Sequence, residues 1–537
     1  MRIVVAVLIS ALGAGLFAAA DTVGVTERSR SASWTFRVSF SGDFPPLDPA
    51  LLPPGQPLWP ELEYATCAKL LNYPDRGGKA GSRVHPEVAA GFPRISRGGR
   101  KYTFTIRRGF RFNTGALVTA STFAYAINRD LNPALASPAV TYLQDIVGAR
   151  AVISGRAATA SGVRAVSTNT LVIRLIRPAF DLVARLAMPY FCAIPKDLPA
   201  TPGGVTPPSS AGPYYYSEYV RGQRLVLRRN PFYRGSRPRK PATIVWSLNQ
   251  PLNTIALQVE RGDADYGIIG IADRSRLARD YGVNRRQFFV APTPSVVCLA
   301  LNTQRPLFKN NVALRKAVNY AIDRPALIEQ FGGFGRATDQ YLAPSMPGFS
   351  DARLYPLERP FVKKAKALAA GHLRSRRAVL YLRNASATAQ ARGQIIQANL
   401  ARIGLQVDVV IQDRTHDPAR RGEPFDMVDV GCPFPDYPDP YATLVAGFDG
   451  RQIRDEHNSN LSYLNNRRFN RLFAAASRLT GPARYRAFGQ IDVELARDVA
   501  PAAAYMVIPR TVFVSARIGC VRINPVYGLS SGAACLR

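Results

Sequence analysis

The strongest constraint on the fold is a strand–helix–strand pattern between residues 378 and 412. The run AVLYLR is short and apolar, and the segment ATAQARGQIIQANLARI after it is long enough for a full helix. Gly404 then precedes a second apolar run, LQVDVVIQ. A strand, a helix and a strand in succession are typical of a sheet covered by helices. The chain is therefore predicted to be an α/β protein.

The first residues have the layout of a secretory signal. Arg2 precedes an apolar run from Ile3 to Ala20 that ends in Ala18-Ala19-Ala20. We expect a signal peptide over residues 1–20, with the mature chain beginning near Asp21 in the extracytoplasmic space, secreted or periplasmic. An uncleaved anchor is the alternative, since the run is just long enough to span a membrane. No other stretch reaches that length, and a chain of 537 residues is expected to form two or more domains.

Six cysteines are compatible with disulfides in an exported protein. Cys520 and Cys535 flank a short Pro/Gly-rich tail, which favours that pair. Cys298 and Cys432 each lie in an apolar, strand-like run, and adjacent strands would bring them together. Cys67 and Cys192 then remain as the third pair. Free buried thiols are the alternative for each pair.

The formal net charge of +33 comes mostly from arginine. A basic chain is attracted to polyanions, and nucleic acid is the first candidate. The arginines are spread along the whole chain, however, without zinc-finger spacing, RNP-like aromatics or a lysine-rich tail. We expect a solvated basic surface, attracted to an anionic envelope, and no nucleic-acid partner.

No catalytic motif stands out, so we predict no catalytic residues, no metal site and no cofactor. The four histidines are far apart, and neither a GxSxG elbow nor a P-loop is present. Asp436 and Asp439 are the one acidic pair of interest, because glycosidases use two carboxylates. Being three residues apart in one loop, they are poorly placed to flank a sugar. A secreted carboxylate-dependent hydrolase remains the alternative function.

That loop, PFPDYPDPY at residues 433–441, follows the apolar run FDMVDVGC. Four prolines exclude a helix or a central strand, because proline fixes φ and has no N–H to donate. The stretch therefore holds acidic and aromatic side chains stiffly at the end of a strand.

Several stretches in order resemble the extracellular family 5 solute-binding proteins of ABC importers, which include oligopeptide- and dipeptide-binding proteins. The matching stretches are LDPALLPP, RKYTFTIRRGFRFNTGALVTASTFAYAINR, AGPYYYSEYVRGQRLVLRRNPFY, ALQVERGDADYG, LALNTQRPLFKNNVALRKAVNYAIDRPALI, GFGRATDQYLAPSMPGF, PDYPDPYATL and PAAAYMVIPRTVFVSARIGC. They run from about residue 34 to the C-terminus.

The resemblance implies a two-lobed periplasmic-binding-protein-like fold of the large type, with a ligand cleft between the lobes and a hinge. Lobe one would comprise residues 34–295 and 498–537, with an inserted subdomain at about 60–165. Lobe two would comprise residues 296–497. The two chain crossings would form the hinge. A monomer that captures a small molecule or peptide and delivers it to ABC permease subunits is implied; a sensor not coupled to transport is a further alternative.

The resemblance also implies the binding residues. In peptide-binding relatives the first aspartate of this loop takes the ligand's α-ammonium, and Asp436 holds that position here. Tyr437, Phe434 and Asn302 are the other residues expected to contact the ligand. Asp436 could instead only tie its loop to backbone N–H groups, and Asp439 is expected to be structural. The strand before the loop offers Asp426 and Asp429 but no arginine for a peptide carboxylate, so a longer peptide, or a cationic or amine-bearing solute, is as credible as a dipeptide.

Overall fold

The structure is a computed structural model that describes residues 34–44, 46–52, 59–205 and 207–537. The predicted signal peptide, residues 1–20, lies outside these residues, and so does the predicted cleavage site. In the described part of the chain, no helix combines the length and the apolar character needed to cross a membrane.

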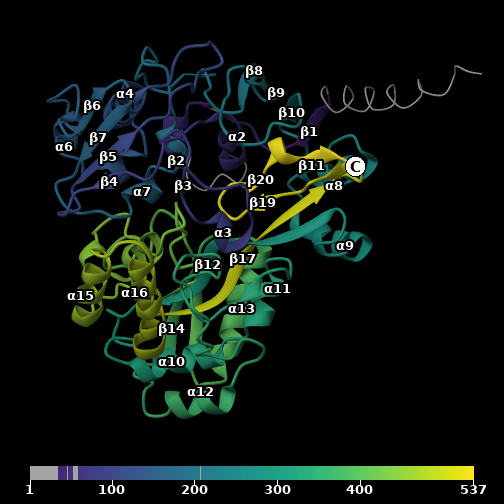
Figure 1. The fold of residues 1–537 in the computed structure, drawn as a ribbon. Coiled ribbons are helices and arrows are strands. Elements are labelled where there is room, and N and C mark those ends of the chain that lie inside the picture. The colour runs from purple at the N-terminus through teal and green to yellow at the C-terminus, as the bar shows by residue number, and fades with distance from the viewer. Residues whose placement is uncertain (1–33, 45, 53–58, 206) are drawn as a thin grey trace, which may run out of the picture.

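One eleven-stranded mixed sheet runs through the whole molecule (Figure 1). Its order is β15 (Gln406–Ile411), β14 (Arg377–Leu382), β16 (Met427–Val428), β12 (Phe288–Leu301), β17 (Ala502–Val514), β11 (Tyr266–Gly267), β1 (Thr35–Ser39), β10 (Thr243–Ser247), β9 (Arg224–Arg229) and β8 (Tyr214–Val220), with β13 (Arg336–Ala337) beside β17. Strands from the N-terminal and middle parts of the chain thus share one sheet.

Two long antiparallel strands, β12 and β17, connect the two lobes. In Figure 1 they run side by side from the lower lobe to the upper one. Their pairing is regular from Phe288 to Pro292 and resumes at Val296, with an irregularity between. Pro292 there lies opposite Pro509, and proline supplies no N–H to the ladder. The pairing is therefore weakest midway between the lobes, where a hinge requires backbone freedom.

Lobe two is an α/β sandwich, because successive side chains of β12 pack alternately into two different hydrophobic cores. Val297, Leu299 and Leu301 lie in one hydrophobic core cluster, whereas Val296 and Cys298 lie in another. Successive side chains of a strand point to opposite faces, so both faces of the sheet are buried. Helices on the first face are α10 (Val312–Ala321), α11 (Arg324–Glu329), α12 (Val362–Ala369) and α13 (Ala387–Ala401); those on the second are α15 (Arg467–Ala476) and α16 (Gly481–Glu494).

The predicted strand–helix–strand unit is confirmed as β14, α13 and β15. Strands β14 and β15 are parallel and pair in register along six residues. Ser386 begins the helix by accepting a hydrogen bond from the N–H of Ala389, and Gly404 adopts a positive φ of 86° after its end. Ile396 and Leu400 bury the helix against the sheet.

The packing of β17 indicates where the chain passes from lobe two back to lobe one. The first half of β17, including Ala502 and Val507, packs in the cores of lobe two, whereas Val512 and Val514 pack in lobe one. We therefore propose that the chain returns to lobe one within β17, after Val507, whereas the return was expected at residue 498 from the sequence.

Lobe one holds the other end of the sheet and the inserted subdomain. The subdomain has a separate four-stranded sheet of order β4 (Arg94–Ile95), β5 (Lys101–Thr105), β7 (Thr170–Arg174) and β6 (Val163–Ser167), with α4 (Ala120–Leu131), α5 (Val140–Leu143), α6 (Ala149–Ile153) and α7 (Leu182–Arg185). We propose that the subdomain includes β7 and α7, beyond the end at about residue 165 that was expected from the sequence. The remaining helices and strand pairs of lobe one are α2 (Trp59–Thr66), α3 (Gly78–Gly81), α8 (Leu252–Arg261), α9 (Ile271–Tyr281), β2 (Leu71–Asn72) with β3 (His85–Pro86), β18 (Ile518–Gly519) with β21 (Cys535–Leu536), and β19 (Ile523–Asn524) with β20 (Gly528–Leu529).

All three predicted disulfides are confirmed. Each pair has a Cα–Cα distance of 5.4 Å, the usual separation for a disulfide. Adjacent strands explain Cys298–Cys432, because β12 pairs with β16 just before Cys432. The bonds are Cys67–Cys192, Cys298–Cys432 and Cys520–Cys535.

Replacing both Cys520 and Cys535 with serine is expected to destabilise lobe one. The bond closes a loop with a sequence separation of 15. Losing that constraint on the unfolded chain should lower the free energy of unfolding by about 3 kcal/mol or less. Urea unfolding of the oxidised protein and the variant measures the difference. Equal midpoints and slopes would show that the bond adds no stability.

Candidate functional site

The Pro-rich loop at residues 433–441 is fixed at its start by covalent and backbone constraints. Cys432 is bonded to Cys298 of β12, and the N–H of Gly431 donates to the carbonyl of Cys298 at 2.9 Å. Gly431 lies so close to Ala300 that a Cβ would come within 2.6 Å of it. Val430 adopts a φ of 57°, which is strained for a β-branched residue. The chain is thus forced out of β16 in one defined direction.

Asp439 fixes the other end of the loop. Both of its oxygens accept hydrogen bonds from the guanidinium of Arg484 at 2.7 Å, and one also accepts from the N–H of Tyr441 at 2.9 Å. Asp439 and Arg484 are both buried. These contacts support the expected structural role for Asp439.

Asp436 lies between these two anchors and faces a cavity between the lobes. The hydroxyl of Tyr142, in lobe one, donates to its Oδ2 at 2.7 Å. No other hydrogen bond to this carboxylate is found within the described ranges. The side chain is open to the cavity, yet surrounding protein displaces much of its water. This burial raises the pKa of the Asp436 carboxyl above its usual range, and the hydrogen bond from Tyr142 offsets part of that rise.

Tyr437 joins the lobes directly. Its hydroxyl donates to Oδ2 of Asp181 in lobe one at 2.8 Å, and its ring meets that of Tyr142 edge to face at 6.3 Å. Arg185 holds Asp181 and Asp145 from the other side through ion pairs of 3.1 and 3.0 Å. The buried Tyr437 therefore stabilises the contact between lobes, and its ring borders the cavity.

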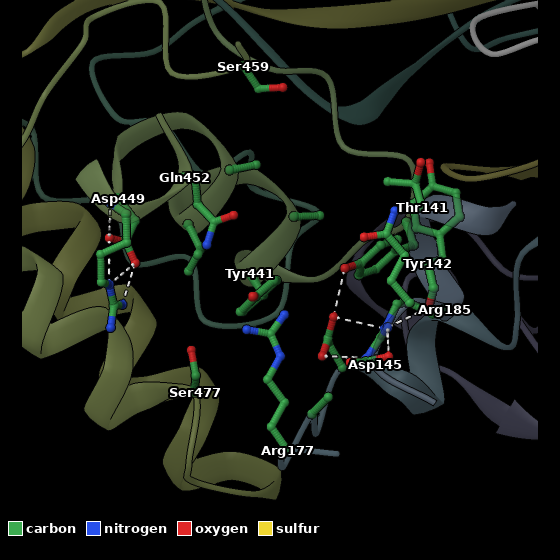
Figure 2. A pocket seen from close by; sticks show the side chains of 18 of the residues that line it. Thr141, Tyr142, Asp145, Arg177, Arg185, Tyr441, Asp449, Gln452, Ser459 and Ser477 are labelled. Atoms are coloured by element: carbon green, nitrogen blue, oxygen red, sulfur yellow. Dashed lines mark hydrogen bonds and ion pairs between the residues drawn. The ribbon is translucent and has the colours of Figure 1, made fainter. Parts of the chain in front are cut away.

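The cavity has a volume of about 770 Å³ and is lined by both lobes. Its lobe-one wall comes from residues 141–145 and 177–185, and its lobe-two wall from residues 436–484. Figure 2 shows Arg177 extending from the lobe-one side into the space near Tyr441. A volume of this size accommodates a small organic molecule or a short peptide.

Three cationic side chains of this cavity differ from its other arginines in their surroundings. Arg177, Arg454 and Arg478 are exposed and line the cavity. In the part of the chain that the structure describes, none of the three forms an ion pair. The other arginines at the cavity do have partners: Arg185 binds Asp145, Arg451 binds Asp449, and Arg484 binds Asp439.

Sequence reasoning missed these arginines because they are not local to the loop. The strand before the loop, where a partner for a peptide carboxylate was expected, contains Asp426 and Asp429 but no cation. Both of these are structural, since Asp426 accepts from the N–H of Val379 at 2.9 Å and Asp429 binds Arg392 at 2.8 Å. Arg177 follows β7 in the other lobe, and only the tertiary fold brings it to the site.

The remaining two predicted contact residues lie outside the cavity wall. Asn302 is buried, donates its amide to the carbonyl of Phe425 at 3.1 Å, and accepts from the N–H of Gln304 at 3.1 Å. Phe434 is 40% exposed and does not line the cavity. In the described residues, the cavity thus brings together Asp436 and Tyr437 but neither Asn302 nor Phe434.

The geometry is unfavourable for the alternative hydrolase. A two-carboxylate mechanism needs a second free carboxyl group, and both oxygens of Asp439 are held by Arg484. Glu63, Cys67 and Cys192 have ligand atoms close enough for a metal ion, but the two sulfurs are joined to each other and offer no thiolate.

Comparison with known proteins agrees with this architecture. Residues 83–455 match the family model described as bacterial extracellular solute-binding proteins, family 5 Middle. The nickel-binding periplasmic protein of Escherichia coli K12 is 27% identical over 425 residues, 74% of this chain and 75% of that protein. The probable deoxycholate-binding periplasmic protein YgiS of the same organism is 25% identical over 284 residues, 51% of this chain and 52% of that protein.

The fold has close structural counterparts. A solved structure of clavulanic acid biosynthesis oligopeptide binding protein 2 superposes with a TM-score of 0.81 at 24% identity, covering 94% of this chain and 96% of that one. The two-lobed fold is thereby shown. Because the family model spans more than two thirds of the sequence, the chain belongs to the family 5 bacterial extracellular solute-binding proteins.

Proposed function

We propose that the protein is the extracytoplasmic solute-binding component of an ABC importer, which captures a peptide or another amine-bearing solute between its lobes and delivers it to a membrane permease. The observation that carries this proposal is the Asp436 carboxylate, exposed to an interlobe cavity with one hydrogen-bond donor, Tyr142. A partly desolvated carboxylate gains most from a charge-assisted partner such as an ammonium group.

The other charged groups of this cavity narrow the class of solute. Arg177, Arg454 and Arg478 line the same cavity, and no ion pair to them is found among the described residues. A purely cationic solute would be repelled by three guanidinium groups, whereas a zwitterion can place its ammonium at Asp436 and its carboxylate near an arginine. These groups favour a peptide or a similar zwitterion over a bare cation.

The alternative from another class is a solute sensor that binds in the same way without coupling to transport. Neighbouring permease and ATPase genes would favour import, and their absence would favour sensing. A monomer is proposed, since the ligand site is built from the two lobes of one chain.

The direct test is mass spectrometry of the small molecule that remains bound after purification. A zwitterionic amine, recovered at about one molecule per protein and rebinding in calorimetric titration, is the expected result. Recovery of a solute without an amine, together with no binding of amines, would contradict the proposal. The purified chain should also show no hydrolysis of the recovered solute.

Binding of that amine is expected to weaken as the pH falls. Burial raises the pKa of Asp436 above its ordinary value, so the free site takes up a proton sooner than an exposed aspartate does. Only the ionised carboxylate pairs with an ammonium, so affinity should fall by about tenfold per pH unit once the pH is below that raised pKa. Calorimetric titration from neutral to acidic pH measures this dependence. Asp436→Asn should flatten it, and an equally steep profile in that variant would assign the proton to another group.

A further inference from the structure

A second cavity, of about 1080 Å³, lies between the lobes and shares Arg484 with the first. Its lobe-one wall comes from residues 79–95 and 180–184, and its lobe-two wall from Asp439 and residues 347–350 and 480–497. Asp436 and Tyr437 do not line it. The second cavity is therefore a separate space, which the proposed function does not use.

Its wall is largely apolar and aromatic. Phe92 and Ile95 from the subdomain and Phe180 from the loop after β7 line one side, and Phe349 lines the other. Phe92 is 58% exposed and Ile95 is 37% exposed, which is high for large hydrophobic side chains. Covering them with an apolar group would release about 25 cal/mol for each Å² removed from water.

The rim of the second cavity carries excess positive charge. Arg484 and Arg497 are neutralised by Asp439 and Asp498, each at 2.7 Å. The carboxylate of Glu494 is already bound to Arg468.

Lys79, Arg83 and Arg486 complete the charged lining. All three are exposed and, in the described ranges of the chain, have no carboxylate partner. Lys79 contacts only an aromatic face, with its Nζ 5.7 Å from the ring centre of Phe349. Three free cations thus border an apolar wall.

We propose that this second cavity binds an amphipathic anion, a molecule with an apolar chain or ring body and a carboxylate, sulfate or phosphate head group. The apolar body would cover Phe92, Ile95 and Phe349, and the head group would lie among Lys79, Arg83 and Arg486. Neither contact alone selects such a ligand, since an inorganic anion gains nothing from the apolar wall and a neutral lipid gains nothing from the cations. Because both lobes line the cavity, this ligand stabilises the present arrangement of the lobes without occupying the Asp436 site.

The test uses decanoate as the probe, below its micelle-forming concentration, in calorimetric titration of the purified chain. Decylammonium has the same chain with the opposite charge, and acetate has the head group without the chain. Saturable binding of decanoate, with much weaker binding of both comparators, is expected. Equal binding of decylammonium, or no saturable binding of decanoate, would overturn the proposal.

Matched variants locate the probe. The double variant Arg83→Gln/Arg486→Gln should weaken decanoate binding by about tenfold, as expected for losing two partly screened ion pairs. Arg221→Gln/Arg228→Gln removes the same charge from the exposed β8–β9 hairpin and should leave binding within about twofold. Equal weakening by both double variants would show an effect of net charge only and would reject the site.

Two further variants separate this site from the first cavity. Phe92→Ser removes apolar surface and should also weaken decanoate binding, whereas Asp436→Asn should leave it unchanged. Loss of decanoate binding in Asp436→Asn would place the probe in the first cavity and overturn the second site. If Asp436→Asn keeps decanoate binding but loses amine binding, both proposed sites are supported. Circular dichroism melting of each variant confirms that the chain is folded.

Discussion

Replacing Asp436 with asparagine is expected to weaken binding of the amine ligand by on the order of 30-fold or more, because removing one partner of a buried charge pair typically costs about 2–5 kcal/mol. Asparagine keeps the shape of the side chain and can still accept the hydrogen bond from Tyr142, which is 2.7 Å long in the native chain. The ammonium would then lie beside a neutral amide. Calorimetric titration of both proteins with the recovered ligand measures the loss.

Stability without ligand distinguishes binding from scaffolding. Asp436 accepts no backbone N–H in the described structure, so the ligand-free melting temperature should change little. Asp263→Asn is the matched control, since Asp263 is an exposed aspartate that does not line the cavity and its loss changes net charge equally. A variant with normal affinity and a lowered melting temperature would show that Asp436 only supports its loop.

The sequence predicts most of the fold because the signals for it are local. The apolar, strand-like run around Cys298 and the helix between residues 387 and 403 depend on neighbours along the chain, and both appear in the structure. The pairing of Cys298 with Cys432 followed from the same kind of signal, since cysteines in adjacent strands are brought together by the sheet.

Only the lobe-two side of the candidate site was predictable from the sequence. The loop around Asp436 is distinctive in sequence, whereas Tyr142 and Arg177 belong to ordinary stretches of the subdomain. They reach the cavity through the packing of one lobe against the other, which has no local signal. Asn302 is the opposite case. It lies in a distinctive stretch of sequence, yet its amide donates to the backbone carbonyl of Phe425 and does not reach the cavity.

The high arginine content is also explained in part by the interior. The sequence suggested a solvated basic surface, yet several arginines are buried. Arg324 donates to the carbonyls of Thr338, Ala504 and Pro356, and burial lowers its pKa to about 10. Arg129 is fully buried against Asp48. A guanidinium group has several N–H donors, so inside the protein it can hydrogen-bond backbone carbonyls that would otherwise lack a donor.

Arg484→Met is expected to be the most destabilising single change near the site. Two of the three guanidinium nitrogens bind Asp439 at 2.7 Å in a buried setting, and the cation lies 5.0 Å from the ring centre of Phe488. Methionine fills much of the volume but leaves the Asp439 carboxylate buried without a counter-charge. Removing one partner of a buried pair should lower the free energy of unfolding by about 3–5 kcal/mol. Denaturant unfolding measures this change.

A second substitution tests the cause. In Arg484→Met/Asp439→Asn, the asparagine keeps an acceptor for the N–H of Tyr441 but carries no charge, so more than half of the lost stability should return. Arg471→Met on α15 is the matched control, since Arg471 is exposed, and it should change stability by no more than about 0.5 kcal/mol. A double variant no more stable than Arg484→Met would show that the loss comes from packing around Phe488. If the charge pair is the cause, the double variant should also regain the amine affinity that Arg484→Met loses, because Asp439 holds the loop that presents Asp436.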